Sequence, residues 1–335
     1  MSLFSSKIQN VIGPGIIFAG AAIGGSHLMS STTAGARFGF SLIVLILITN
    51  FLKYPFLLVG TRFTASTGMT LLEGFKKRNS LYLPIFLIIS LVTGTFTIAA
   101  VSFVSGVLLT NIPLFSNFPP MDLSLMVLVI CGFILLIGKY KALDNLSKIL
   151  VSLLSILTFF AVISLLTKSS LNKELTATIF NPEVSPWRLS NLSFLIPLMG
   201  WMPCPVELCV WPSLWMFSKN KQSKYMPTIK EAQFDFNLGY LITIVTAIFF
   251  VTLGAITMYG TGEGMLSGSG VSFAQNLIKL YTESIGEWSK WVIIPASFAA
   301  MFSTTLTCLD AYPRSISSIQ GLLRGTDLGR IESSS

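Results

Sequence analysis

The chain has 335 residues, of which 52% are hydrophobic and only 11% are charged. Soluble domains carry about 25% charged residues because their surfaces meet water, so this composition excludes an ordinary soluble protein. The 22 basic residues outnumber the 14 acidic ones, but they lie in short loops between apolar runs, which does not indicate a nucleic-acid-binding surface. The composition therefore predicts an integral membrane protein whose surroundings are a lipid bilayer, with no nucleic-acid partner.

Eight apolar runs are long enough to cross a bilayer, which takes about 17 to 25 residues for a helix. Only helices satisfy their own backbone hydrogen bonds in lipid, so an all-α fold is predicted. We expect a single polytopic domain over residues 1–335, with spans near 11–36, 41–62, 82–110, 122–138, 145–167, 191–216, 237–260 and 288–312.

The polar connections 168–190 and 261–287 are expected to be solvated outer loops, and a short amphipathic helix near 272–283 is the alternative for the second. The tail after Arg324 is expected to be disordered. With the N-terminus inside, fifteen Lys and Arg residues fall on the inner side and six on the outer side. Cytoplasmic loops carry such an excess, so we predict both termini in the cytoplasm and a place in the cell inner (plasma) membrane.

The first and the sixth predicted spans are each interrupted near the middle. Gly24-Gly25-Ser26 interrupts the first, because glycine tolerates non-helical backbone angles. Pro203 and Pro205 interrupt the sixth, where each removes a backbone donor. A single break is commonly a kink or a packing notch. Two breaks five spans apart are typical of transporters built from inverted repeats, which bind substrate at unwound backbone.

Ionisable and soft side chains beside these breaks are the candidate ligands, because charge inside a membrane is expensive to keep. Glu207 follows the second break, in the first turn of a half-helix whose dipole also stabilises a carboxylate without any transport role. His27, the single histidine, follows the first break and is either a ligand or a satisfied core residue. Met202 and Cys204 offer sulfur beside the second break.

Other ionisable and sulfur groups have simpler interpretations. Asp310 and Arg314 are spaced to form an ion pair on one helix face. Lys53, inside the second span, is expected to snorkel or to pair. The four cysteines lie in apolar runs, which predicts buried free thiols. With one histidine and no nucleophile–base pair, an enzyme is not expected, and neither is a cofactor.

Three segments resemble the NRAMP family of metal-ion transporters. Residues 13–40 resemble its first-span signature, with a Gly-Pro start, a central break and an Ala-Gly-Ala-polar-aromatic-Gly-aromatic run. Residues 199–214 resemble the segment around the family's Met-Pro-His, and residues 303–312 resemble its Ser/Thr-rich eighth span. The resemblance implies a LeuT-like inverted repeat with broken helices in spans 1 and 6, and alternating-access symport of a divalent metal ion with protons.

The sequence departs from the family at the metal site. The family's Asp-Pro-Gly-Asn aligns with residues 24–27, so Gly24 replaces the metal-binding aspartate and His27 replaces the asparagine. The family's Met-Pro matches residues 202–203 or 204–205, and the histidine that follows it is absent in both registers. The second repeat needs further spans after the eighth, so the chain is expected to be a truncated product with that repeat incomplete.

These residues define a predicted ion site formed by Gly24, His27, Met202, Cys204 and Glu207. We expect His27 and Glu207 to face one cavity and to ligate the metal, because a nitrogen and oxygen set suits a transition metal better than magnesium or calcium. Two alternatives stay open. One is a transporter of a non-metal cationic or neutral solute on the same scaffold, and the other is a truncated remnant that does not transport.

Overall fold

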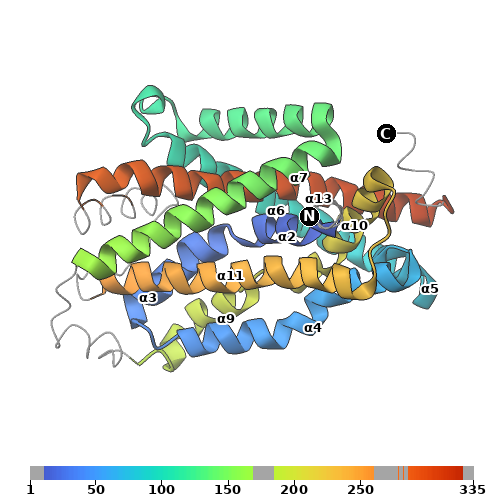
Figure 1. Cartoon of the computed structure of the whole chain (residues 1–335), viewed down its shortest axis with the longest axis horizontal. Coiled ribbons are helices and arrows are strands. Elements are labelled where there is room, and N and C mark those ends of the chain that lie inside the picture. Colours follow the sequence, from blue (N-terminus) through green and yellow to red (C-terminus); the bar gives the residue numbers. More distant parts are fainter. Residues whose placement is uncertain (1–10, 169–184, 260–277, 279–281, 283–285, 327–335) are drawn as a thin grey trace, which may run out of the picture.

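The computed structural model describes residues 11–168, 185–259, 278, 282 and 286–326, and every regular element in these residues is a helix. Six of the helices are long and apolar enough to cross a membrane, by length and composition. Figure 1 shows the long helices running roughly side by side along the longest axis of the molecule. The predicted all-α membrane fold is confirmed.

The first span consists of two half-helices with an unwound stretch between them. α2 (Pro14–Ala22) begins with a proline, whose missing N–H lies at a position that needs no hydrogen bond. A π-helical turn, η1 (Ser26–Ser31), and α3 (Thr32–Phe38) follow the break. The helix ends at Ala22, two residues before Gly24, and Ile23 and Gly24 are not helical, so the predicted interruption of the first span is confirmed.

The second and third spans are continuous helices that agree closely with the predicted ranges. They are α4 (Ile43–Thr67) and α6 (Tyr82–Leu109). A short helix between them, α5 (Leu71–Arg78), starts at a capping box formed by Thr70 and Glu73. The sequence analysis did not predict this helix, because it concentrated on apolar runs long enough to cross a bilayer.

The fourth and fifth spans are both contained in α7 (Pro120–Lys168). Lys139 has φ 47° and ψ −146°, which is not helical, and the chain reverses its direction there. Figure 1 shows the two green arms of α7 running back past one another. The predicted boundary between spans near 138 and 145 is therefore confirmed.

The sixth span is the second broken helix. It consists of α9 (Leu192–Trp201), a short 3-10 turn, η4 (Val206–Cys209), and α10 (Val210–Ser223). The backbone between Met202 and Pro205 is not helical, and the Met202–Pro203 peptide bond is cis. The predicted interruption by the two prolines is confirmed.

The last two spans are longer than predicted. α11 (Ile229–Met258) starts before the expected residue 237, because Thr228 and Glu231 form a capping box that begins the helix earlier. α13 (Lys290–Leu323) continues beyond the expected residue 312 and contains Pro313. The predicted start of the seventh span and the predicted end of the eighth were both wrong, because polar residues were taken as the boundaries of an apolar span.

α11 packs along both halves of the first span (Figure 1). A β-carbon on Gly239 of α11 would lie 1.9 Å from the carbonyl oxygen of Gly15 in α2. A β-carbon on Gly254 would lie 2.1 Å from the carbonyl oxygen of Thr32 in α3. Glycines allow such close contact between helix backbones in membranes. The two halves of the broken span are thereby packed against one continuous helix.

Most of the two predicted outer loops, the alternative helix near 272–283 and the tail beyond residue 326 lie outside the described residues. The predicted cysteine chemistry is confirmed, because all four thiols are free and buried. The i,i+4 pair is also present, with Arg314 Nη2 2.6 Å from Asp310 Oδ1.

Candidate functional site

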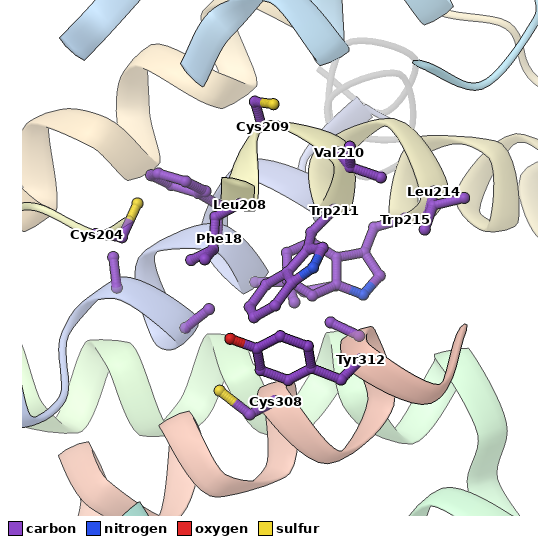
Figure 2. Close-up of a cluster of buried hydrophobic side chains, with 14 of the residues drawn as sticks. Phe18, Cys204, Leu208, Cys209, Val210, Trp211, Leu214, Trp215, Cys308 and Tyr312 are labelled. Carbon is purple, nitrogen blue, oxygen red and sulfur yellow. The ribbon is translucent and has the colours of Figure 1, made fainter. Parts of the chain in front are cut away.

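A pocket of about 320 Å³ lies between the two breaks. Figure 2 shows part of its wall, with the indole of Trp211 against the ring of Tyr312, and their ring centroids are 4.8 Å apart. Apolar and aromatic side chains dominate the lining. The residues around the pocket are Ala21, Ala22, Gly24, Gly25, Ser26, Phe96, Thr97, Ala100, Val101, Trp201, Pro203, Cys204, Pro205, Leu208, Trp211, Thr304, Cys308 and Tyr312.

The first break contributes backbone to the pocket and has no room for a larger residue at position 24. A β-carbon on Gly24 would lie 2.5 Å from Thr304 Oγ1, which is far inside contact distance. The Thr304 hydroxyl lies 3.0 Å from the carbonyl oxygen of Gly20 and 3.2 Å from that of Ile23, at the carbonyl end of α2. Thr304 therefore occupies the space that an aspartate at position 24 would need.

His27 is fully buried, but it does not line the pocket. Its Nδ1 lies 2.8 Å from Ser26 Oγ, and its Nε2 lies 3.0 Å from the carbonyl oxygen of Thr243 in α11. Because a carbonyl only accepts, Nε2 carries a proton and donates. Position 24 faces α13, and the break with its π-helical turn puts His27 against α11 instead.

Glu207 is half-buried in η4 and also does not line the pocket. The Tyr312 hydroxyl, which does line it, donates to Glu207 Oε1 at 3.2 Å. His27 thus contacts α11 while Glu207 contacts α13. The structure therefore does not bring the two side chains together at this pocket, and a role for either as a metal ligand stays a prediction.

Of the two sulfur-containing side chains at the second break, one lines the pocket and the other does not. Met202 is fully buried and accepts from Ser31 Oγ at 3.7 Å, away from the pocket, whereas Cys204 lines it. Cys308 of α13 also lines the pocket, and the sequence analysis missed it because it lies in an apolar run far from either break. Across the described ranges, no group of three or more His, Cys, Asp or Glu side chains is arranged to hold a metal ion.

Lys53 was expected either to snorkel or to pair, and in the structure it pairs with backbone carbonyl groups. Its Nζ donates to the carbonyl oxygens of Met199 and Gly200, both at 2.6 Å, and of Cys204 at 3.2 Å. These carbonyls belong to the end of α9 and to the unwound stretch after it. The lysine therefore binds the backbone of the segment whose side chains border the pocket.

Several acidic residues lie deep in the bundle outside the pocket. Asp235 of α11 accepts from the backbone N–H groups of Gly13 at 3.0 Å and Gly15 at 2.7 Å, at the start of α2. Asp144 accepts from Lys148 at 3.0 Å and from Lys219 at 2.8 Å. Asp235 was missed because the seventh span was expected to start after it, although the capping box at Thr228 signals an earlier start.

Residues 15–322 match the model of the family described as Natural resistance-associated macrophage protein-like, or Nramp. The chain belongs to the Nramp family. Nramp proteins are membrane transporters of metal ions and not enzymes. An uncharacterized protein of Pasteurella multocida (strain Pm70) is 38% identical over 313 residues, which cover 93% of this chain and 71% of that protein.

The fold of this Nramp chain is similar to solved structures of a manganese transporter from Eremococcus coleocola. Its complex with an aromatic bis-isothiourea substituted compound has a TM-score of 0.71 at 16% identity, covering 97% of this chain and 67% of that chain. A histidine-to-alanine mutant of the same transporter has a TM-score of 0.70 at 16% identity, covering 94% of this chain and 66% of that chain. The predicted LeuT-like fold with breaks in spans 1 and 6 is confirmed.

Proposed function

We propose that this Nramp chain moves a divalent metal cation across the membrane by alternating access, with the pocket between the two breaks as its binding site. The observation that supports this most directly is the meeting of both unwound segments at one pocket, as Gly24, Gly25, Pro203 and Cys204 all line it. Transporters with broken helices bind their substrates at such a place. Membership of a family of metal transporters supports the choice of substrate.

The ligands available in the pocket are soft or neutral. Cys204 and Cys308 offer thiols, while Thr97, Thr304 and Tyr312 offer hydroxyl oxygens. Thiols select soft and borderline metals over magnesium and calcium. We therefore propose that the substrate is a transition-metal or similarly soft cation, and that the negative charge of Glu207 acts through the hydrogen bond from Tyr312.

Proton coupling is the further element of this proposal. We propose that a proton crosses together with the cation on a group other than Glu207, because the charge of Glu207 is needed for the cation. Uptake of the cation into proteoliposomes should then acidify the lumen and should increase when the outside is made acidic. Uptake that is insensitive to a proton gradient would remove this element and leave the transport proposal in place.

Uptake into proteoliposomes tests the substrate. We expect accumulation of Cd²⁺ and Mn²⁺ above empty liposomes, with Mg²⁺ and Ca²⁺ at the background. Cys308→Ala should lower Cd²⁺ uptake about tenfold, since a soft ligand is lost. Cys131→Ala is the matched control, because Cys131 is also a buried free thiol but does not line the pocket. Background uptake of every divalent cation would show that the substrate is not a metal.

A neutral organic solute is the second candidate, and the size and chemistry of the pocket favour it. Small-molecule sites usually measure about 300–1,000 Å³ and are mostly apolar, and this pocket of about 320 Å³ has walls that include Phe96, Trp201 and Trp211. Thermal stabilisation of the metal-free protein by neutral solutes, without any stabilisation by divalent cations, would support this candidate against the first.

A further inference from the structure

The carbonyl end of α9 is occupied by an ammonium group from another helix. Lys53 lies in the middle of α4, which packs against α9 (Figure 1). Its Nζ is 2.6 Å from the carbonyl oxygens of Met199 and Gly200 and 3.2 Å from that of Cys204. An ammonium group has three protons to donate, so each proton has a carbonyl acceptor.

These carbonyls are acceptors that a mid-membrane helix end leaves without helical partners. α9 stops at Trp201, so its last carbonyl groups lack donors one turn further on. The end of a helix also carries partial negative charge, which attracts a cation. In broken-helix transporters, carbonyls of this kind coordinate the transported ion. Here a side chain of the protein already supplies the positive charge.

The surroundings of Lys53 make this contact necessary. The neighbouring Leu52 and Phe56 are 60% and 61% exposed, which in a bilayer places them against lipid. A charged group beside lipid needs protein partners in place of water. Among the residues that the structure describes, the partners of Lys53 are the three carbonyls and no carboxylate.

The two breaks therefore differ in charge. The carbonyl end of α2 lies against neutral hydroxyl groups, with Ser26 Oγ 2.9 Å from the carbonyl oxygen of Ala22 and Thr304 Oγ1 3.0 Å from that of Gly20. The carbonyl end of α9 instead binds the ammonium group of Lys53, which is part of the protein and is not a transported ion. Lys53, Met199 and Gly200 do not line the pocket, but Cys204 does. A metal ion at the second break would therefore meet a positive charge bound to the backbone of a pocket residue, and a Cys204 carbonyl that already has a donor.

We propose that Lys53 is a resident cation of the second break, which competes with a metal ion for the carbonyl oxygens of residues 199–204 and thereby sets the charge selectivity of the pocket. The inference rests on the proposed function only in placing the metal ion at this break. Removing the ammonium group frees the carbonyls and removes the repulsion, so divalent cations then bind more tightly.

Quenching of tryptophan fluorescence by paramagnetic Mn²⁺ measures binding without transport, because Trp201 and Trp211 line the pocket. We expect Lys53→Met to raise the affinity for Mn²⁺ at least about tenfold over the unaltered protein, and Lys53→Arg, which keeps the charge, to change it little. Lys53→Gln keeps N–H donors for the carbonyls without a charge, and serves where the methionine variant does not fold. Arg62→Gln, which removes a basic group elsewhere on α4, is the control and should have no effect.

The outcomes separate this inference from metal transport itself. Binding of Mn²⁺ by Lys53→Met or Lys53→Gln but not by the unaltered protein would support the resident cation and overturn metal transport. Equal or weaker binding by both folded neutral variants would overturn the resident cation alone. The same increase in Arg62→Gln would also overturn it, since the effect would then be a general loss of positive charge.

Discussion

Gly24 and Thr304 pack so closely that the residue at position 24 decides whether the first break keeps its geometry. A β-carbon on Gly24 would lie 2.5 Å from Thr304 Oγ1, whereas one on the adjacent Gly25 would have an ordinary contact of 3.8 Å with the ring of Trp201. We predict that Gly24→Ala lowers the free energy of unfolding by about 1–3 kcal/mol through overpacking, while Gly25→Ala changes it little. Thermal unfolding in detergent measures both, and equal midpoints would contradict the prediction.

Tyr312 connects the pocket to Glu207, so its hydroxyl group should matter for cation binding. A hydrogen bond to a charged group contributes about 1.5–3 kcal/mol, so Tyr312→Phe should weaken cation binding about tenfold or more if the carboxylate acts through this bond. Tyr240→Phe is the control, since Tyr240 donates to the carbonyl oxygen of Asn50 and does not line the pocket. Unchanged binding in Tyr312→Phe would show that Glu207 has no part in the site.

At this scale, the sequence identified which backbone segments border the pocket but not where their side chains point. The Gly24 and Cys204 segments were found because glycine and proline interrupt an apolar run visibly. The direction in which the His27 side chain points depends on the π-helical turn after the break, and no pattern of residues in the sequence predicts such a turn. The partner of Lys53 was hidden because backbone carbonyls 146 or more positions away have no sequence signal.

Among the helices, α11 is the element on which the first span depends. It supplies Asp235 to the N–H groups at the start of α2, and its glycines let the backbones of α2 and α3 come close. The sequence placed the start of this helix too late, because one charged side chain inside a span was taken as a boundary. In the fold that side chain is satisfied by a helix N-terminus, which apolar periodicity does not reveal.

We predict that Gly239→Ala separates α2 from α11 and strongly destabilises the protein. The added methyl group would lie 1.9 Å from the carbonyl oxygen of Gly15, so the helices must move apart. Gly132→Ala in α7 is the matched control, because nothing lies within 4 Å of its added methyl group. The yield of folded protein and its thermal midpoint measure the effect. Similar values for the two variants would contradict the prediction that the contact between α2 and α11 requires glycine at position 239.

For the whole molecule, the unequal distribution of basic residues predicts that both termini face the cytoplasm. Lys77 and Lys221 are exposed and lie on the predicted inner side. The native thiols are buried, so cysteines placed at these two positions report on their own accessibility. We expect both to be protected from a membrane-impermeant thiol reagent in intact cells and labelled after the membrane is opened. Labelling of either one in intact cells would reverse the predicted topology.

Most of the architecture could be predicted from hydropathy, because each membrane-spanning helix must satisfy its own backbone hydrogen-bonding groups. Eight spans, a boundary between residues 138 and 145 and two interrupted spans were predicted on that basis. The structure has six long apolar helices because α7 contains two of these spans and the first span is broken into short pieces. Helix ends were less predictable, since a capping box at the start of α11 and a half-buried ion pair near the end of α13 lie beyond their apolar parts. Whether the chain forms one domain, as expected, stays a prediction.

The packing of α11 has a consequence for how such a molecule changes shape. Because glycine contacts pack both α2 and α3 closely against one unbroken helix, we expect the unwound residues between them not to act as a hinge. At the second break, a β-carbon on Gly60 of α4 would lie 2.0 Å from the carbonyl oxygen of Cys209, so a glycine contact holds the half that follows the break. In the described part of the chain, no glycine contact of this kind holds the α9 half, which is held by Lys53 and by apolar side chains. We therefore expect the first broken span and α11 to move as one rigid body, and we expect any movement of α9 to break both its contact with Lys53 and its packing against Phe38.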